Sequence, residues 1–532
     1  MTPFMPLLLT LVPIAIILCM LIVWKKPADV SGIVGWLVVS VIAVFAFQTS
    51  PEVILRSTAA GFIRSFSVSL IVATSLFQMA YMEKSGALRR IIIFIKTLAC
   101  GNRAVQIMMI NIGFGTLMVA VGATPVSLLP PILVAMGYST YVAIALPAIG
   151  YDSLCTYALL GAPIVVFVDV ANGFLGAGQE ISLSQAGRIF FRLLPIVSTL
   201  IAGSMLWIVG KWNAIRDGWL PCLITGAVIG GVSYVTNQFD NLVVLTGVLC
   251  GLAVIAAMII YLRITGNGLI DRSRLDADEL RYAENFPLWR ALSPWIILVV
   301  VILGLNVPEG MFNLLYRELR LPVLGLTANG APLDTRALWQ AYTWILASTV
   351  LSIPILRPSA AQLRESASVW IRRAPRPVFS AAIFFAIGEI MNMTGYDMEA
   401  KSFAVPSMIK ILADHSANFF SDAYGLVVTF IGLFGGFVTG SEASTIAMFG
   451  KYTLNTANNL GLDLNGMILI MAALAFGGGL ASVISPAKLQ NAAASIDKLG
   501  AENQVIRAAF VLSLLLTLIT SLLVLLFLRF SA

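Results

Sequence analysis

Long apolar segments recur along almost the whole chain, and most of them are long enough to cross a lipid bilayer as a helix. The segments are continuous rather than alternating in polarity, which excludes a membrane β-barrel. Charged residues make up only 11% of the sequence, whereas soluble domains carry about 25%. The pattern therefore predicts an all-α polytopic membrane protein with about 12 transmembrane helices. We place these spans at 4-24, 31-48, 65-82, 138-169, 190-210, 218-236, 241-262, 291-308, 339-356, 377-395, 464-495 and 505-528.

Two further apolar stretches, 107-136 and 424-450, differ from these spans because glycine, proline and small polar residues interrupt them. We expect each stretch to form a re-entrant hairpin that enters the bilayer and returns to the same side. The first stretch is interrupted by Gly113, Gly115, Gly122, Thr124, Pro125, Pro130 and Pro131, and the second by Gly432, Gly435, Gly436, Thr439, Gly440, Ser441 and Glu442.

The distribution of lysine and arginine predicts the orientation of the chain. With both termini outside, about two thirds of the 33 basic residues fall in the inner loops, as the positive-inside rule requires. The net charge of +7 is explained by this excess, and no basic run longer than two residues suggests a nucleic-acid partner. We expect a multi-pass protein of the inner (plasma) membrane, in contact with lipid.

An internal repeat appears when the segments are compared in order. Helix 65-82 is followed by an amphipathic stretch, a hairpin and a long helix with a polar break around 150-153; helix 377-395 is followed by the same series, with the break around 482-486. The two hairpins enter from opposite sides, so the halves have inverted topology, which is typical of secondary transporters. The predicted organisation is a first repeat at 1-212, linking helices and a cytoplasmic connector at 213-290, and a second repeat at 291-532.

The breaks and hairpin tips are the predicted binding site, because irregular backbone is tolerated in a membrane only where it lines a cavity inside the protein. The N-terminus of a half-helix offers free N–H groups that suit a carboxylate. The alternative is that the small residues only let helices pack closely. The candidate substrate-binding residues are Gly122, Thr124, Tyr151, Ser153, Thr439, Gly440, Ser441, Ser444, Ser482, Ser485 and Lys488.

Charged residues inside apolar segments indicate possible sites for coupling to an ion. Glu442, at the second hairpin tip, and Asp152, in the first break, are the candidate proton carriers; Asp152 could equally cap the second half of its helix. Lys488 could face the substrate carboxylate or extend to the inner surface. We expect Glu389 to lie near the outer end of its helix and to face water.

Other classes of function find no support in the sequence. No HExxH, GxSxG, Walker A or kinase motif is present, so an enzyme is not predicted. The five cysteines are scattered and form no CxxC pair, which predicts neither a zinc site nor a disulfide framework. We expect no metal and no cofactor. A passive anion facilitator or channel stays open as an alternative to a coupled transporter.

Several of these segments resemble a known family. Residues 436–444, Ala447-Met448-Phe449-Gly450, and the run from Gly477-Gly478-Gly479 to Ile484-Ser485-Pro486 are similar to motifs in the second half of the bacterial L-lactate permeases. Looser matches in the first half keep the same order: Lys84-Ser85-Gly86, Gly113-Phe114-Gly115, residues 122–126 and Gly161-Ala162-Pro163. The resemblance implies proton-coupled uptake of small 2-hydroxy monocarboxylates such as L-lactate and glycolate. It also implies kinship with the ion-transporter superfamily, whose members use two hairpins and elevator-type motion, often as homodimers.

The chain departs from this family in its charges. The family's glutamate in the first hairpin is absent from residues 117–120, its Asn-Thr corresponds to Tyr151-Asp152, and its lysine before Ile-Ser-Pro corresponds to Ser482. Because these charges have moved, a sodium-coupled transporter of another small organic anion is an alternative to the proton-coupled permease.

Overall fold

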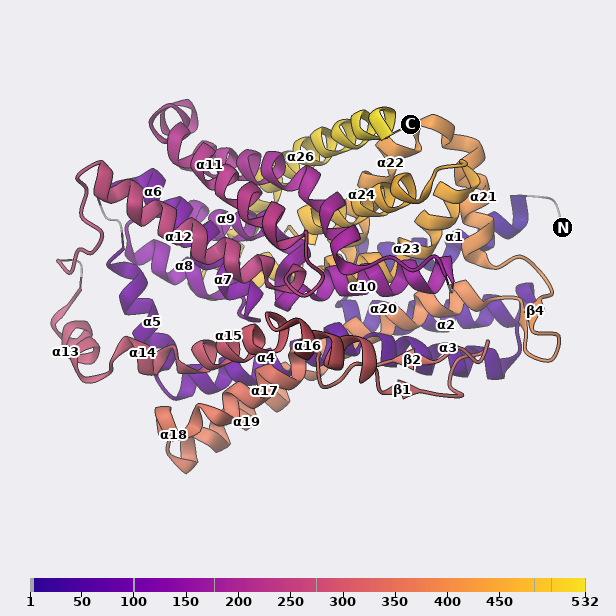
Figure 1. Cartoon of the computed structure of the whole chain (residues 1–532), viewed down its shortest axis with the longest axis horizontal. Helices are drawn as coiled ribbons and strands as arrows, with labels where there is room; N and C mark the ends of the chain where they lie inside the picture. Colours follow the sequence, from indigo (N-terminus) through magenta and orange to yellow (C-terminus); the bar gives the residue numbers. More distant parts are fainter. Residues whose placement is uncertain are drawn as a thin grey trace.

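Nearly the whole chain is helical, and most helices run along the long axis of the molecule (Figure 1). The structure is a computed structural model that describes residues 4–98, 101–176, 178–273, 275–482, 484–498 and 500–531. Strands within these ranges are limited to two antiparallel pairs of two residues each, with Pro322 opposite Asp334 in one pair and Tyr396 opposite Phe403 in the other.

The elements of the first half and the following helices are, in order, α1 (Phe4–Leu18), η1 (Cys19–Val23), α2 (Ala28–Phe47), α3 (Pro51–Arg64), α4 (Phe66–Lys84), α5 (Ala87–Lys96), α6 (Arg103–Ile107), η2 (Met108–Phe114), α7 (Gly115–Ala120), α8 (Pro125–Ala135), α9 (Thr140–Gly150), η3 (Tyr151–Tyr157), α10 (Ala158–Leu175), α11 (Leu183–Thr236), η4 (Val243–Leu245) and α12 (Thr246–Ile264).

The remaining elements are α13 (Ala277–Asn285), α14 (Leu288–Ala291), α15 (Ser293–Asn306), α16 (Glu309–Phe312), η5 (Asn313–Glu318), β1 (Pro322–Val323), β2 (Leu333–Asp334), α17 (Ala341–Leu351), α18 (Ile353–Leu356), α19 (Ala360–Arg373), α20 (Pro375–Met393), β3 (Tyr396–Asp397), β4 (Ser402–Phe403), α21 (Met408–Phe420), η6 (Ser421–Ala423), α22 (Tyr424–Thr439), α23 (Glu442–Asn459), α24 (Leu464–Ser482), α25 (Pro486–Ala494) and α26 (Glu502–Ser531).

The prediction of an all-helical polytopic membrane protein is confirmed. Within the described ranges, 11 helices are long and apolar enough to cross a membrane, or 12 if the pair Ser293–Asn306 and Glu309–Glu318, bent by 89°, forms one span. Segments 190-210 and 218-236 are the two arms of α11, which are separated by the non-helical residues Gly210 and Lys211. The arms pack against each other, because a Cβ on Gly230 would lie 2.9 Å from the Cγ of Pro195.

Two amphipathic helices, α3 and α19, were not predicted. Helix α3 lies beside α20, and the two backbones approach so closely that a Cβ on Gly61 would lie 2.4 Å from the Cα of Ala386. Its amphipathic sequence, with Glu52, Arg56 and Arg64 among apolar residues, lacks the continuous apolar run by which the spans were identified.

The basic loops gather at one end of the long axis. Figure 1 places α5, α13, α14 and α18 at this end, and the N-terminal helix, α21 and β4 at the other. The connector that contains α13 is docked on α5: Lys96 pairs with Glu279, and Arg90 Nε donates to the carbonyl of Phe286 at 2.7 Å. The end that carries these cations is the one that the positive-inside rule assigns to the cytoplasm.

The closest helix contact in the second half joins α22 to α24. A Cβ on Gly432 would lie 2.0 Å from the carbonyl oxygen of Leu474, and one on Gly436 would lie 2.1 Å from that of Gly478. Such a separation is possible only without side chains, so this glycine pair lets the two backbones touch. The contact fixes the first arm of the second hairpin against the helix that precedes the second break.

Candidate functional site

The turn of the second hairpin is built by three adjacent residues. Helix α22 ends at Thr439, Gly440 takes a left-handed conformation at φ +66°, and the Ser441 side chain accepts a hydrogen bond from the backbone N–H of Ser444 at 3.3 Å. A glycine suits the positive φ, and a serine N-cap satisfies one of the free N–H groups of the next helix. Glu442 is therefore the first residue of α23.

The Glu442 side chain is buried where the hairpin meets both broken helices. The hydroxyl of Thr156, in η3, donates to its Oε1 at 2.8 Å. Its Oε2 is buried without a hydrogen-bond partner, and a Cβ on Gly479 of α24 would lie 2.9 Å from that oxygen. A buried carboxyl whose second oxygen has no hydrogen-bond partner is costly as an anion, so it can accept either a proton or a ligand's donor group.

Two hydroxyls of the tip serve the turn itself. Thr439 Oγ1 lies 2.9 Å from the carbonyl oxygens of Gly435 and Ser441, and Thr445 Oγ1 donates to the Ser441 carbonyl at 2.9 Å. Ser444 is buried beside them. These hydroxyls stabilise the conformation that presents Glu442.

The second break lies directly against this tip. A Cβ on Gly440 would lie 3.2 Å from the Oγ of Ser485 and 4.0 Å from the Cε of Lys488. Ser485 is buried, and its carbonyl accepts the N–H of Lys488 at the start of α25. Of the two positions considered for Lys488, the structure therefore places its side chain beside the hairpin tip.

The first hairpin has its tip against other elements. Gly122, at φ +91°, lies against α4 and α17, because a Cβ there would be 2.8 Å from the Cβ of Ser75 and 3.6 Å from Ile345. Thr124 is exposed and precedes α8 without a side-chain cap. The first hairpin contacts the second broken helix, because α8 packs against α25.

The first break extends further along the chain than the sequence suggested. After η3, Leu159 and Leu160 have φ of +53° and Gly161 has φ of +77°. Two consecutive leucines in the left-handed region are strained, which is common at functional sites. The predicted side chains of Tyr151, Asp152, Ser153 and Ser482 lie outside the described part of the chain, so their roles stay predictions.

One group of charges escaped the sequence analysis. Glu389 is buried rather than facing water, and its Oε2 lies 3.8 Å from Arg64 Nε and 3.5 Å from Lys451 Nζ. The three residues come from α3, α20 and α23, so no local motif joins them. One signal in the sequence could have pointed to this group: Lys451 lies inside an apolar hairpin segment, where charged residues are rare unless they have a function.

Neither the hairpin tip nor the group around Glu389 is a candidate metal site among the described residues. Among the residues that the structure describes, no group of three or more His, Cys, Asp or Glu side chains could hold a metal ion.

Comparisons with known proteins give a consistent result. The model of the L-lactate permease family matches residues 6–530. Glycolate permease GlcA of Escherichia coli is 22% identical over 94% of this chain and 91% of its own length, and L-lactate permease of Bacillus subtilis is 24% identical over 96% and 94%. A solved structure of Neisseria gonorrhoeae MtrF, described as illuminating a class of antimetabolite efflux pumps, covers 94% of both chains at 13% identity; its TM-score of 0.46 is too low to support an argument.

Proposed function

Since the chain belongs to the L-lactate permease family, we propose that it takes up small 2-hydroxy monocarboxylates, such as L-lactate and glycolate, by symport with protons. Membership of this family, together with the 11 or 12 apolar helices of the described residues, makes the protein a multi-pass inner-membrane permease and not an enzyme. The substrate class is taken from the relatives, which are L-lactate and glycolate permeases. The choice of a proton as the coupling ion rests on the environment of Glu442.

The observation that carries the proton proposal is the environment of Glu442. Its carboxyl group is buried at the hairpin tip, where the hydroxyl of Thr156 donates to Oε1 and Oε2 has no hydrogen-bond partner. A negative charge in such a place needs compensation, and a proton supplies it without any other ligand. Glu442 is therefore the main proton carrier in this proposal, and Asp152 is the second.

The substrate carboxylate would bind on the opposite side of the same tip. The N–H groups at the start of α23 point towards the turn, and Ser485 and Lys488 lie against Gly440. Lys488 would provide a positive charge, and the N–H groups and hydroxyls would orient the anion. The substrate site we propose comprises Thr439, Gly440, Ser441, Ser444, Ser482, Ser485 and Lys488 from the second half, with Gly122, Thr124, Tyr151 and Ser153 from the first.

The order of elements supports an inverted-repeat transporter. Helix α4, the amphipathic α5, a hairpin and the broken series α9, η3 and α10 correspond in order to α20, α21, the hairpin α22–α23 and the broken pair α24 and α25. We propose that both hairpins are re-entrant and move with the broken helices in an elevator-type cycle, in a homodimer. Cross-linking of the protein in native membranes would test the dimer.

The experiment is uptake of labelled L-lactate and glycolate into proteoliposomes under an inward proton gradient without sodium. Accumulation that a protonophore abolishes is expected. At 1:1 coupling, a gradient of one pH unit supports about tenfold accumulation. Uptake that follows a sodium gradient and ignores the protonophore would favour sodium coupling, and equilibration without accumulation would favour a passive facilitator.

Glu442→Gln tests the proposed proton carrier. The amide keeps the size of the side chain and an oxygen for Thr156, but it cannot exchange a proton in this pH range. We expect loss of proton-driven accumulation with counterflow exchange retained. Glu399→Gln, on an exposed loop, is the matched control and should behave as the wild type. Normal accumulation by the Glu442 variant would remove this residue from the coupling mechanism.

A further inference from the structure

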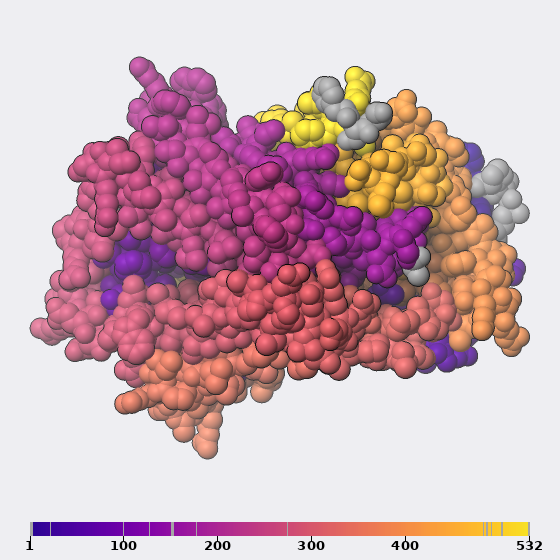
Figure 2. Space-filling model, viewed as in Figure 1, coloured from indigo at the N-terminus to yellow at the C-terminus, as the bar shows by residue number. Residues whose placement is uncertain are grey.

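A charged cavity lies between the two halves of the molecule, away from the hairpin tip. Its volume is about 860 Å³, and its lining comes from α3, α10, α20, α23 and the segment 313–340. Figure 2 shows a hollowed seam where the magenta part of the chain meets the salmon part, which contains this segment. The cavity lies in the half of the molecule that contains β3 and β4, at the end predicted to face outside.

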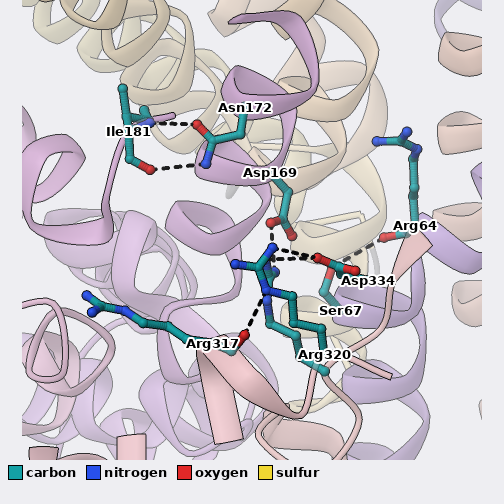
Figure 3. Close-up of polar contacts among 9 residues, drawn as sticks. Arg64, Ser67, Asp169, Asn172, Ile181, Arg317, Arg320 and Asp334 are labelled. Carbon is teal, nitrogen blue, oxygen red and sulfur yellow. Dashed lines mark hydrogen bonds and ion pairs between the residues drawn. The ribbon is translucent and has the colours of Figure 1, made fainter. Parts of the chain in front are cut away.

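The arginines near the rim of this cavity have carboxylate partners. Asp169 and Asp334 lie 2.8 and 3.8 Å from Arg336. Arg320 lies 3.4 Å from Asp334, and Figure 3 labels both of these residues. Arg317 pairs with Asp240 at 2.8 Å. These three arginines are therefore paired with carboxylates, and with Glu180 also in the lining this part of the cavity has no excess of positive charge.

The inner wall has an excess of positive charge. Arg64 and Lys451 share one carboxylate oxygen of Glu389, and both distances exceed that of a good hydrogen bond. The Nε of Arg64 is buried and has no hydrogen-bond partner. In Figure 3 the Arg64 guanidinium points away from the Asp334 group. Two cations facing one anion leave a net charge of one in a place where only 15% of the Lys451 side chain is exposed, which is costly unless another anion binds.

We propose that Arg64 and Lys451 form a second anion site, which receives the carboxylate of a small 2-hydroxy acid in the outer cavity. Glu389 holds the two cations in place. Asn392 lies one turn further along α20 and also lines the cavity, so its amide can bond the hydroxyl of the acid. The choice of this ligand rests on the proposed function.

The site is distinct from the hairpin tip. Lys451 follows Glu442 by nine residues on α23, which corresponds to about 13 Å along the axis and places the side chain on the opposite face of the helix. The outer site would therefore hold the anion before it reaches the tip.

The test measures the local charge of the cavity rather than transport. Asn392→Cys is introduced into the full chain in proteoliposomes, and its reaction with an anionic and a cationic membrane-impermeant methanethiosulfonate is compared after subtraction of the reaction of the parent protein. We expect the anionic reagent to react faster, by a ratio of at least about fivefold, and glycolate or L-lactate to slow the reaction. Asn329→Cys, near the rim of the same cavity, should show no such preference.

Further variants and ligands separate the outcomes. In the Asn392→Cys background, Lys451→Met should remove the preference for the anionic reagent, and Glu389→Gln should increase it. A preference of the introduced thiol for the cationic reagent, or no protection by the hydroxy acids, would overturn the proposal, and equal protection by chloride would overturn the assignment of a carboxylate. Because protection needs no transport, absence of lactate uptake with protection intact would refute the proposed function alone.

Discussion

Substitution of Gly436 by alanine tests whether the contact between α22 and α24 positions the hairpin tip. The new Cβ would lie 2.1 Å from the carbonyl oxygen of Gly478 and 2.7 Å from its carbonyl carbon. Ordinary contact requires about 3.4 Å, so the two helices must separate by about 1 Å. The clashing atoms belong to the backbone and cannot rotate away.

The cost of this separation can be estimated. Overpacking a well-packed contact costs about 1–3 kcal/mol, and a buried helical alanine returns less than about 1 kcal/mol of helix propensity. A shift of α22 would also move Gly440 and Ser441, and with them the 2.8 Å contact between Glu442 and Thr156. A displacement of about 1 Å at a site can cost about 100-fold in rate, so transport should fall more than stability.

Two assays on purified protein measure these effects: thermal unfolding in detergent and initial uptake in proteoliposomes. Gly231→Ala is the matched control, because Gly231 is an exposed helical glycine with nothing within 4 Å of the added Cβ. We expect Gly436→Ala to unfold at a lower temperature and to transport slowly, while Gly231→Ala matches the wild type or exceeds its stability. Wild-type melting and uptake in Gly436→Ala would refute the argument that backbone contact here sets the geometry of the tip.

Two further substitutions address the binding site and the outer loops. Lys488→Met should raise the KM for L-lactate or glycolate uptake by about tenfold, because the bound carboxylate loses its positively charged partner. Lys498→Met, on the exposed loop after α25, is the control and should leave the KM unchanged. An unchanged KM in Lys488→Met would place Lys488 outside the substrate site. Burial raises the pKa of Asp240. Hydrogen bonds from Ser184 and Ser182 and the charge of Arg317 together lower this pKa by more than burial raises it, so it lies below its ordinary value. This carboxylate thus stabilises the fold above the ordinary pKa of about 3.9, and the benefit is lost as the pH falls through its lowered pKa. Asp240→Asn should cost about 1 kcal/mol at pH 7 and less near pH 3 in thermal unfolding; an equal loss at both pH values would contradict this assignment.

The parts of the structure that follow from local sequence were predictable. Continuous apolar runs located the membrane helices, and a cluster of small polar residues with one acid located the tip of the second hairpin within 439–445. The structure places the turn at Gly440 and the start of α23 at Glu442. Each of these features depends on residues that are neighbours in the chain. The proximity of Ser485 and Lys488 to that turn follows less directly, because it depends on how α25 is placed after the break.

The features that escaped prediction depend on contacts between distant segments. Helix α3 is amphipathic, and its packing on α20 is made possible by the close approach at Gly61. The sequence around Glu389 does not say which face of α20 will meet α3 and α23, so its pairing with Arg64 and Lys451 could not be inferred. A single sequence does not say which face of a helix packs against which distant helix, and these contacts depend on that choice.

The placement of both charged sites on α23 has a consequence for the transport cycle. Glu442 begins this helix of 18 residues, and Lys451 lies on its opposite face against Glu389 of α20. If the second hairpin moves relative to α20, as the elevator proposal requires, Lys451 must leave Glu389, and the charges of Glu389 and Arg64 lose one partner. An anion bound between Arg64 and Lys451 would stabilise the arrangement before that movement, whereas neutralisation of Glu442 by a proton would lower the cost of moving the tip. We therefore expect occupancy of the outer site to favour the outward-facing state, and departure of the anion towards the tip to release the hairpin.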